Sequence, residues 1–211
     1  MVVQHYVDDP LLLDRCKFDL RLYVLVRSLS PLKIYLYEEG LSRLATCDYE
    51  KPNSSNQKNM WMHLTNYAIN KTSPNFIFNK DGSEDHLGHK RSLSATMKLL
   101  QNLGCDCQQL QAQIDHIIVK TIVSAQPILL KKYREIREVK EEMESVCFEI
   151  LGFDILIRED FTPLLLEVNH SPSFAAETPL DLIIKKHLLL DTLNLLNLNP
   201  EDKIHYFKSR N

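Results

Sequence analysis

The chain has 211 residues, of which 44% are hydrophobic and 25% are charged, and its formal net charge is -3. A chain of this size can bury a core of one or two domains, and its charge does not favour a general nucleic-acid binder. It has neither an apolar run of membrane-spanning length nor the pattern of a signal peptide, so we expect a cytoplasmic protein without a membrane partner. Five scattered cysteines fit a reducing compartment, and Cys105-Asp-Cys107 lacks the second pair that a zinc site needs.

The first quarter of the chain predicts strands. Residues 2–7 form a short apolar run that we predict to be a strand ending in a turn. Residues 18–26 and 33–37 are rich in β-forming side chains and predict an antiparallel hairpin with a longer loop. Residues 38–40 are expected to close the second strand, and 41–46 can continue the sheet.

The middle of the chain predicts loops and then helices. Residues 50–60 and 72–90 are rich in Asn, Ser, Lys and Asp, which is typical of solvated loops, and they flank an ordered segment at 62–71. Residues 92–103 form a plausible helix, and 110–125 carry apolar residues at helical spacing.

The last third predicts two more strands and a helix. Residues 133–144 are dense in charge and predict either a solvated helix or a loop. Residues 147–157 and 163–168 are apolar runs that predict strands, and 180–196 predicts an amphipathic helix. The order favours an α+β fold, with an antiparallel sheet and helices packed on one side of it.

Three oxygen-bearing side chains stand out in these last strands. Asp154 lies inside one apolar run, and Glu167 and Asn169 lie two residues apart at the end of the next, so the latter two share a face. A buried carboxylate needs a cation or hydrogen-bond donors. Mg²⁺ fits this set of hard oxygen ligands, and the alternative is a buried salt bridge to Arg21 or Lys17.

A row of charges occupies the first predicted hairpin. Lys17, Asp19 and Arg21 are two residues apart, so one face of a strand carries all three. Arg21 can brace a phosphate in forked geometry and Lys17 can approach a nucleotide as a point charge; the alternative is a surface ladder of little energetic value. Arg43 lies near Arg21 if the hairpin folds back, and together they favour an anionic ligand, whereas an isolated Arg43 is simply exposed.

The segment His63-Leu-Thr-Asn66 offers neutral hydrogen-bonding groups that suit ribose or phosphate oxygens. Its alternative interpretation is a helix-capping motif. The chain contains neither a P-loop nor a Rossmann fingerprint, so any nucleotide must be held in another way.

Five motifs then occur in a particular order: KFDLR, YEEGLSR, HLTNYAINK, GFDILI and LLEVNHSPSF. In this order they resemble the tubulin tyrosine ligase-like family, and most closely its polyglutamylase branch. The resemblance implies that residues 1–198 are the C-terminal part of an ATP-grasp catalytic domain and that 199–211 are a polar tail. It also implies that the N-terminal lobe is missing, so we expect this chain alone to bind ATP weakly and to show little ligase activity.

The resemblance implies a role for each motif residue. Arg21, Arg43 and Glu167 would be catalytic, and Asp154, Glu167 and Asn169 would hold Mg²⁺. Arg43, Lys71 and His170 would bind the glutamate substrate. The ATP-binding residues would be Gln4, His5, Tyr6, Val7, Lys17, Asp19, Arg21, His63, Leu64, Thr65 and Asn66.

The implied reaction is ATP-dependent amide-bond formation between free glutamate and the glutamate side chains of tubulin tails. His170 resembles members that elongate glutamate chains rather than start them. The resemblance implies a location on the cytoskeleton, in a cilium or flagellar axoneme and at basal bodies. Alternatives are a non-catalytic tubulin-binding module and a tubulin glycine ligase. Lys185-Lys186-His187 and Lys131-Lys132 are small basic candidates for contact with the acidic tail.

Overall fold

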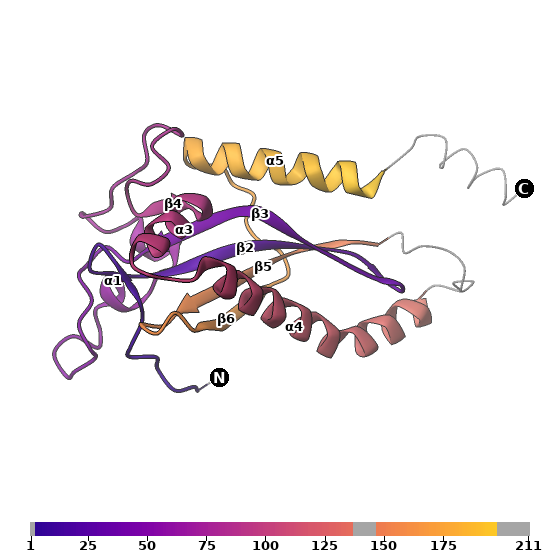
Figure 1. The fold of residues 1–211 in the computed structure, drawn as a ribbon, viewed down its shortest axis with the longest axis horizontal. Helices are drawn as coiled ribbons and strands as arrows, with labels where there is room; N and C mark the ends of the chain where they lie inside the picture. Colours follow the sequence, from indigo (N-terminus) through magenta and orange to yellow (C-terminus); the bar gives the residue numbers. More distant parts are fainter. Residues whose placement is uncertain (1–2, 137–146, 198–211) are drawn as a thin grey trace, which may run out of the picture.

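The computed structural model describes residues 3–136 and 147–197, which fold around one antiparallel sheet (Figure 1). The strands along the sheet run in the order β4-β3-β2-β5-β6, and β1 pairs with β2. The strands are β1 (Leu12–Leu13), β2 (Cys16–Leu29), β3 (Leu32–Leu44), β4 (Lys90–Ser92), β5 (Glu149–Ile157) and β6 (Pro163–Asn169). The helices are α1 (Met60–His63), α2 (Tyr67–Asn70), α3 (Leu93–Asn102), α4 (Cys107–Ile136) and α5 (Pro179–Leu196).

The β2–β3 hairpin forms the centre of the sheet, as the sequence predicted, but two details of the prediction were wrong. Only Ser30 and Pro31 connect the two strands, not a longer loop. The second strand does not close at residues 38–40 but runs to Leu44, which confirms that the segment after Gly40 continues the sheet. Gly40 permits this continuation, since a Cβ there would lie 2.6 Å from the carbonyl oxygen of Arg21.

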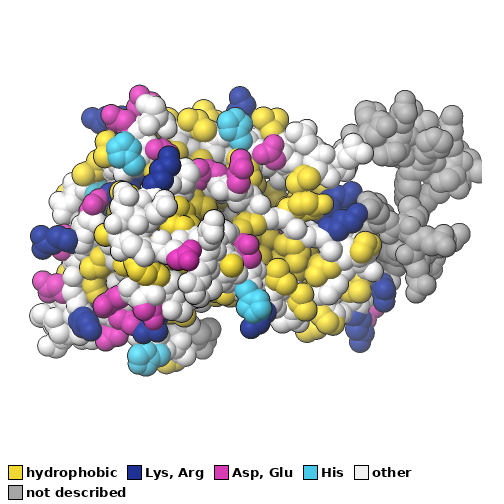
Figure 2. Space-filling model, viewed as in Figure 1, with side chains coloured by type: hydrophobic (Ala, Val, Ile, Leu, Met, Phe, Trp, Pro, Cys, Tyr) yellow, Lys and Arg dark blue, Asp and Glu magenta, His cyan; other side chains and the backbone are white. Residues whose placement is uncertain are grey.

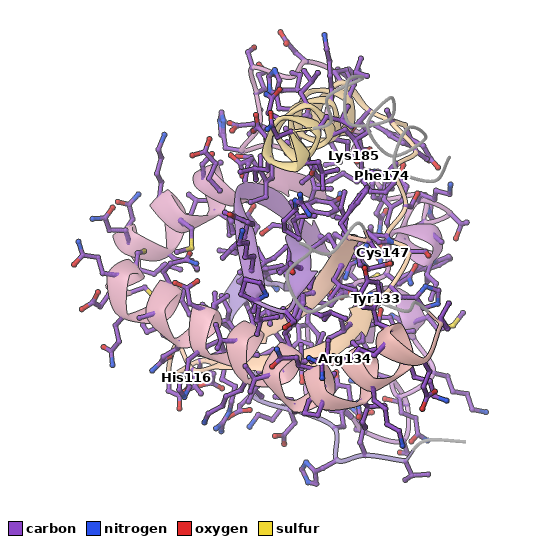
Figure 3. All side chains as sticks on the ribbon, turned by 90° about the vertical axis from the view of Figure 1, so that its right-hand side faces the viewer. His116, Tyr133, Arg134, Cys147, Phe174 and Lys185 are labelled. Atoms are coloured by element: carbon purple, nitrogen blue, oxygen red, sulfur yellow. The ribbon has the colours of Figure 1, made fainter. Side chains whose placement is uncertain are left out.

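Helices cover both faces of the sheet, which corrects the expectation that they pack on one side. Figure 1 shows α5 on one side of the sheet and α4 on the other, and Figure 3 shows this arrangement end-on; α3 shares the core of α4. The larger core joins Phe18, Leu20 and Phe153 of the sheet to α3 and to Ile114 and Ile118 of α4. A smaller core places Leu180, Ile184 and Leu188 of α5 against Tyr23 and Leu41.

The composition of β2 gives the reason for this two-sided packing. After the polar positions at its start, β2 runs as Leu22-Tyr-Val-Leu-Val26, and every one of these residues is buried. A strand with one wet face alternates apolar and polar residues, whereas a strand covered on both faces is a continuous apolar run. The continuous run therefore needed a second layer, and α5 provides it.

The three long helices confirm the predicted ones: α3 lies within residues 92–103, α5 begins one residue earlier than predicted, and α4 is longer at both ends. Ser92 caps α3, its hydroxyl accepting a hydrogen bond from the backbone N–H of Ala95. Thr178 caps α5 in the same way through Asp181 N–H, with Pro179 in the first turn. The predicted 110–125 helix runs on to Ile136 and contains Pro127.

The prediction that α5 is amphipathic was wrong, because apolar residues also lie on its outer side. Figure 2 shows hydrophobic side chains exposed along the part of the molecule that α5 occupies. The apolar residues exposed on α5 are Leu182, Ile183, Leu189, Leu190, Leu193 and Leu195.

The N-terminal segment is not the strand that was predicted for residues 2–7. Residues 3–7 have no strand pairing, and Val3 is 83% exposed, so this short apolar run does not enter the core. Val2, residues 137–144 of the charge-dense segment and the polar tail lie outside the described residues. Within the described parts of the chain, no helix is long and apolar enough to cross a membrane.

Candidate functional site

A cavity of about 450 Å³ opens where the N-terminal segment, the start of β2, α1, α2 and the β5–β6 pair meet. Lys17 and Asp19 come from one face of β2, and Asp154 and Glu167 are opposite each other on β5 and β6. The predicted ATP-binding residues that line it are Gln4, His5, Tyr6, Val7, Lys17, Asp19, His63, Leu64, Thr65 and Asn66. Arg43, Asp154 and Glu167 complete its polar lining, whereas Arg21 does not line it.

A chain of hydrogen bonds holds the lysine in this cavity. Lys17 Nζ donates to the hydroxyl of Tyr6 at 3.2 Å and lies 4.4 Å from the centre of the Tyr6 ring. The Tyr6 hydroxyl lies 3.0 Å from His63 Nδ1, and His63 Nε2 lies 3.1 Å from the carbonyl oxygen of Asn56. Because that carbonyl can only accept, Nε2 carries the proton and Nδ1 accepts from Tyr6. Burial lowers the pKa of Lys17 to about 8, although the nearby Asp19 opposes the shift.

Two arginines and two aspartates form a compact ion cluster on the same face of the sheet. Arg21 binds Asp154 through two hydrogen bonds, and Arg43 binds Asp19 through two more. Arg43 Nη2 also lies 2.7 Å from Asp154 Oδ2. The cluster confirms that the hairpin brings Arg21 and Arg43 together, and these buried residues do not form a surface ladder. Of the two salt bridges considered for Asp154, to Arg21 or to Lys17, the one to Arg21 is present.

The charges of the cluster are mutually stabilised despite their burial. Burial by itself would raise the pKa of Asp154, but its hydrogen bonds and charge interactions with Arg21 and Arg43 outweigh burial and hold the pKa below its usual value. Burial acts to lower the pKa of Arg43, and Asp19 and Asp154 raise it overall. Asp154 is therefore a carboxylate at neutral pH, with two guanidinium groups fixed beside it.

Glu167 and Asn169 lie beside Asp154 at the end of β6. Asp154 is directly opposite Glu167, and the register shifts so that Ile155 is opposite Leu165, which leaves Leu166 as an extra residue. Asn169 Nδ2 lies 3.1 Å from Glu167 Oε1, and Glu167 itself is exposed. Asp154 and Glu167 line the cavity and Asn169 lies next to Glu167, so two carboxylates and one amide oxygen form a donor set that fits Mg²⁺. Among the described residues, no group of three or more His, Cys, Asp or Glu side chains could hold a metal ion.

A second cavity, of about 270 Å³, lies on the other side of Arg43. Arg21, Arg43 and Lys71 line it, so the predicted glutamate-binding residues Arg43 and Lys71 share one cavity. His170 lies outside both cavities, with its ring 2.9 Å from the Ser171 hydroxyl.

The sequence did not indicate several residues of the second cavity. Lys90, Asp181 and Glu177 line it, yet they are far apart in the chain. Lys185 also lines it and is buried, so it is not the exposed basic residue proposed for tail contact. Lys90 ends the segment 72–90, whose Asn, Ser, Lys and Asp residues predicted a solvated loop, yet Lys90 is buried. Only the fold brings these residues together.

The polar segment before α2 caps that helix and also lines the cavities. Asn66 lines both cavities, and its side chain caps α2 by accepting from the backbone N–H of Ala68 at 2.9 Å. Thr65 is buried and lines the first cavity. A capping motif is therefore not an alternative to a place in the site, because the cap fixes the backbone that forms the wall.

The fold and this site define an α+β domain in which basic side chains and carboxylates from five segments of the chain line one cavity. The sequence matches the Tubulin-tyrosine ligase family over residues 1–205, and the chain belongs to that family. It is 48% identical over 209 residues to a "Probable beta-tubulin polyglutamylase" of Tetrahymena thermophila, covering 99% of this chain and 17% of that protein.

Mammalian relatives show the same pattern of similarity. The chain is 46% identical to "Tubulin polyglutamylase TTLL13" of Mus musculus, over 96% of this chain and 25% of that protein. It is 45% identical to "Tubulin polyglutamylase TTLL6" of Homo sapiens, over 96% of this chain and 22% of that protein. The chain thus spans a quarter or less of the length of these relatives.

Proposed function

We propose that the protein carrying this chain is an ATP-dependent ligase that joins glutamate to glutamate side chains of tubulin tails. The observation that carries the proposal is that motif residues from five separate segments meet around the first cavity and its ion cluster. The names of the relatives, which are tubulin polyglutamylases, give the substrate class. The β2–β3–β5–β6 sheet is proposed to be one lobe of an ATP-grasp fold.

The first cavity is proposed to hold ATP. The backbone and side chains of residues 4–7 would border the base, and Thr65 and Asn66 offer hydrogen bonds for ribose and phosphate oxygens. Lys17 supplies a positive charge close to the phosphates. Asp154, Glu167 and Asn169 would hold Mg²⁺, which would offset phosphate charge when bound.

The ion cluster is suited to the charge that builds up when a carboxylate is activated by phosphoryl transfer. Arg21 is fixed in a forked contact with Asp154, so it needs little reorganisation to stabilise negative charge on a transferring phosphoryl group. Arg43 lines both cavities and can therefore contact the amino acid from one side and the phosphate from the other. Positioning and electrostatics carry such a reaction without a nucleophilic side chain.

The proposed partners are tubulin tails and free glutamate, and the proposed location is the cytoskeleton, including cilia or flagellar axonemes and basal bodies. His170 is exposed beside Asn169, so it can reach an extended acidic tail. We propose that it favours elongation. Tail peptides that already carry one branch glutamate should then be better acceptors than unmodified peptides, and His170→Ala should reduce that preference.

The test is transfer of labelled glutamate or labelled glycine to tubulin by the full-length protein. Glu167→Gln should reduce glutamate transfer at least about a hundredfold, because it removes a metal-binding carboxylate, while the melting temperature stays unchanged since Glu167 is exposed. Glu159→Gln alters another exposed carboxylate on the β5–β6 turn and serves as the control. Equal transfer by the Glu167→Gln variant and the wild type would refute the metal-binding role, and transfer of glycine alone would refute glutamate as the substrate.

A further inference from the structure

Strand β3 has one stretch of backbone edge without a neighbouring strand. β2 pairs with β3 between Leu32 and Leu44, whereas β4 pairs with it only from Leu41 to Arg43. Among the described residues, no strand lies beside residues 34–38 on the side away from β2, and we call these residues the β3 edge. A strand at the edge of a sheet presents unpaired N–H and C=O groups, which are a template for another strand.

The pairing of β3 with β2 limits the length of strand that the β3 edge can accept. Leu36 is opposite Val24 but Gly40 is opposite Leu22, so β3 has extra residues at 37–39 and bulges there. Beyond this bulge, β4 already occupies the outer side of β3. The β3 edge therefore suits one short extended segment.

A groove of about 560 Å³ runs along the α4 side of the β3 edge. Ile34 and Leu36 of β3 line it together with Ile118 and Val119 of α4. Val119 is 47% exposed, so part of this apolar wall is in contact with water. A side chain that covers the wall would remove apolar surface from water, which favours binding.

A second groove, of about 450 Å³, lies on the α5 side of the same edge. Tyr35 of β3 lines it together with Leu188 and Leu195 of α5, and Tyr35 is 40% exposed. Figure 1 shows β3 running between α5 and α4, and Figure 2 shows hydrophobic side chains between these two helices. Because successive side chains of a strand point to opposite faces, an added strand would place them in the two grooves in turn.

The charged residues of both grooves are acidic. Glu38 lines both, Asp115 of α4 lines the first and Asp191 of α5 lines the second, and all three are exposed. Among the described residues that line the grooves there is no Lys, Arg or His. Complementary charge speeds association and disfavours partners of the wrong sign. The grooves therefore favour a cationic segment and disfavour an acidic one such as a tubulin tail.

The same charges argue against a second copy of this chain as the occupant. Two β3 edges side by side would bring Glu38, Asp115 and Asp191 of both copies to one seam. Like charges that face each other across paired strands destabilise a sheet. A single cationic segment brings neither these carboxylates nor a second pair of flanking helices.

We propose that the β3 edge binds an extended basic segment of a partner protein by strand addition. The backbone of the segment pairs with β3, its apolar side chains enter the two grooves, and its Lys or Arg residues lie near Glu38, Asp115 and Asp191. In this mode of recognition, main-chain hydrogen bonds give affinity and the pockets for alternate side chains give specificity. The surface is separate from the two cavities of the proposed ligase site.

The first experiment measures peptide binding by fluorescence anisotropy with the full-length protein. The probe is a fluorescein-labelled peptide of about eight residues, enough for one strand, with lysines at both ends and valines between them. It should bind saturably. The same peptide with N-methyl groups on its central backbone nitrogens should bind at least about tenfold more weakly, because it cannot donate the hydrogen bonds of a strand. A peptide with glutamate in place of lysine should also bind at least about tenfold more weakly.

Charge reversal on the protein tests the acidic side chains of the grooves. A triple variant with Glu38→Lys, Asp115→Lys and Asp191→Lys should bind the lysine peptide at least about tenfold more weakly and should prefer the glutamate peptide. The matched control changes the net charge equally at three exposed carboxylates outside both grooves, with lysine in place of Glu50, Glu84 and Glu159. It should retain the wild-type preference. All six side chains are exposed, so the melting temperature of both variants should stay close to that of the wild type.

A variant of the edge itself separates this surface from the ligase site. Tyr35→Lys places a charge on the β3 edge and should reduce peptide affinity at least about tenfold, whereas its transfer of glutamate to tubulin should stay unchanged. Equal binding of the N-methylated peptide, or an equal loss of affinity in the two triple variants, would overturn the proposal. So would sedimentation that shows a dimer of the full-length protein broken by Tyr35→Lys, because the edge would then belong to a second copy.

Discussion

Burial sets the chemistry of single residues in the first cavity, and Lys17 is the clearest case. Its ammonium group is desolvated and its main polar contact is the hydroxyl of Tyr6, so its pKa falls to about 8. A lysine on the surface keeps its charge throughout the neutral range. Lys17 instead changes charge just above neutral pH, so the pH dependence of ligand affinity reports its pKa.

Nucleotide affinity should therefore depend on pH. A lysine of pKa about 8 is about nine-tenths protonated at pH 7 and about one-tenth protonated at pH 9. A bound phosphate raises the lysine pKa, so binding favours the protonated form, and affinity should fall about tenfold as the pH rises from 7 to 9. Fluorescence titration with a labelled ATP analogue measures this effect.

Two variants isolate Lys17 as the source of the pH dependence. Lys17→Met should bind the analogue weakly at both pH values, with a flat profile. Lys17→Arg keeps its charge at pH 9 and should lose less affinity than the wild type does. A tenfold decrease in the Lys17→Met variant would assign the titration to another group.

At the scale of elements, strand β3 depends on a close approach between two backbones. A Cβ on Gly40 would lie 2.6 Å from the carbonyl oxygen of Arg21, and that oxygen belongs to the strand that carries the ion cluster. Gly40→Ala should therefore shift β3 against β2 and reduce the free energy of unfolding by about 1–3 kcal/mol. Urea denaturation followed by circular dichroism measures this.

Ser42, two residues further along the same strand, is a matched control. Its hydroxyl is buried and has no hydrogen-bond partner among the described residues. Ser42→Ala removes an unpaired polar group and should leave the stability unchanged or raise it slightly. If Gly40→Ala and Ser42→Ala change the free energy of unfolding equally, the close backbone approach at Gly40 does not contribute to the stability of β3.

The sequence predicted most helices and strands correctly where the local pattern of apolar residues was clear. The hairpin, β5 and β6 were predicted from runs of β-forming or apolar residues, and α4 was predicted from apolar residues at helical spacing. Residues 3–7 were misassigned as a strand because a short apolar run has no period that separates a strand from an extended segment. The two-residue turn was missed because Ser28 to Pro31 all look like loop residues, although Ser28 and Leu29 are still paired in β2.

At the scale of the whole molecule, the sheet lies between two cores, and each should contribute to a single cooperative unfolding transition. Leu188 of α5 is 3% exposed in the smaller core and Ile118 of α4 is 2% exposed in the larger. Leu188→Ala and Ile118→Ala should each cost about 2–5 kcal/mol of stability, because each leaves a cavity in a packed layer. Thermal melting followed by circular dichroism measures both.

Leu189, the next residue on α5, provides the comparison. It is 39% exposed, so Leu189→Ala should change stability by no more than about 0.5 kcal/mol. A small effect of Leu188→Ala together with a large effect of Leu189→Ala would mean that α5 is rotated by about 100° and presents a different side to the sheet. That result would also remove the support of Asp181 and Lys185 for the second cavity.

The sequence by itself determined the local chemistry of this protein. It identified Lys17, Asp19 and Arg21 on one face of a strand, because alternation in a strand is a local property. It also identified Asp154, Glu167 and Asn169 in two apolar strands, because a carboxylate inside such a run must have a partner. The resemblance of the five motifs to one family added the roles that these residues were expected to have.

Only the tertiary structure decided which residues share a cavity and which partner each charge has. Asp154 pairs with Arg21 and Arg43, not with Lys17, because the strand register determines which residues are opposite each other. Lys90 and Asp181 are 91 residues apart and meet only because α5 packs on the second face of the sheet. Contacts between distant segments depend on the packing of layers, which no local period in the sequence encodes.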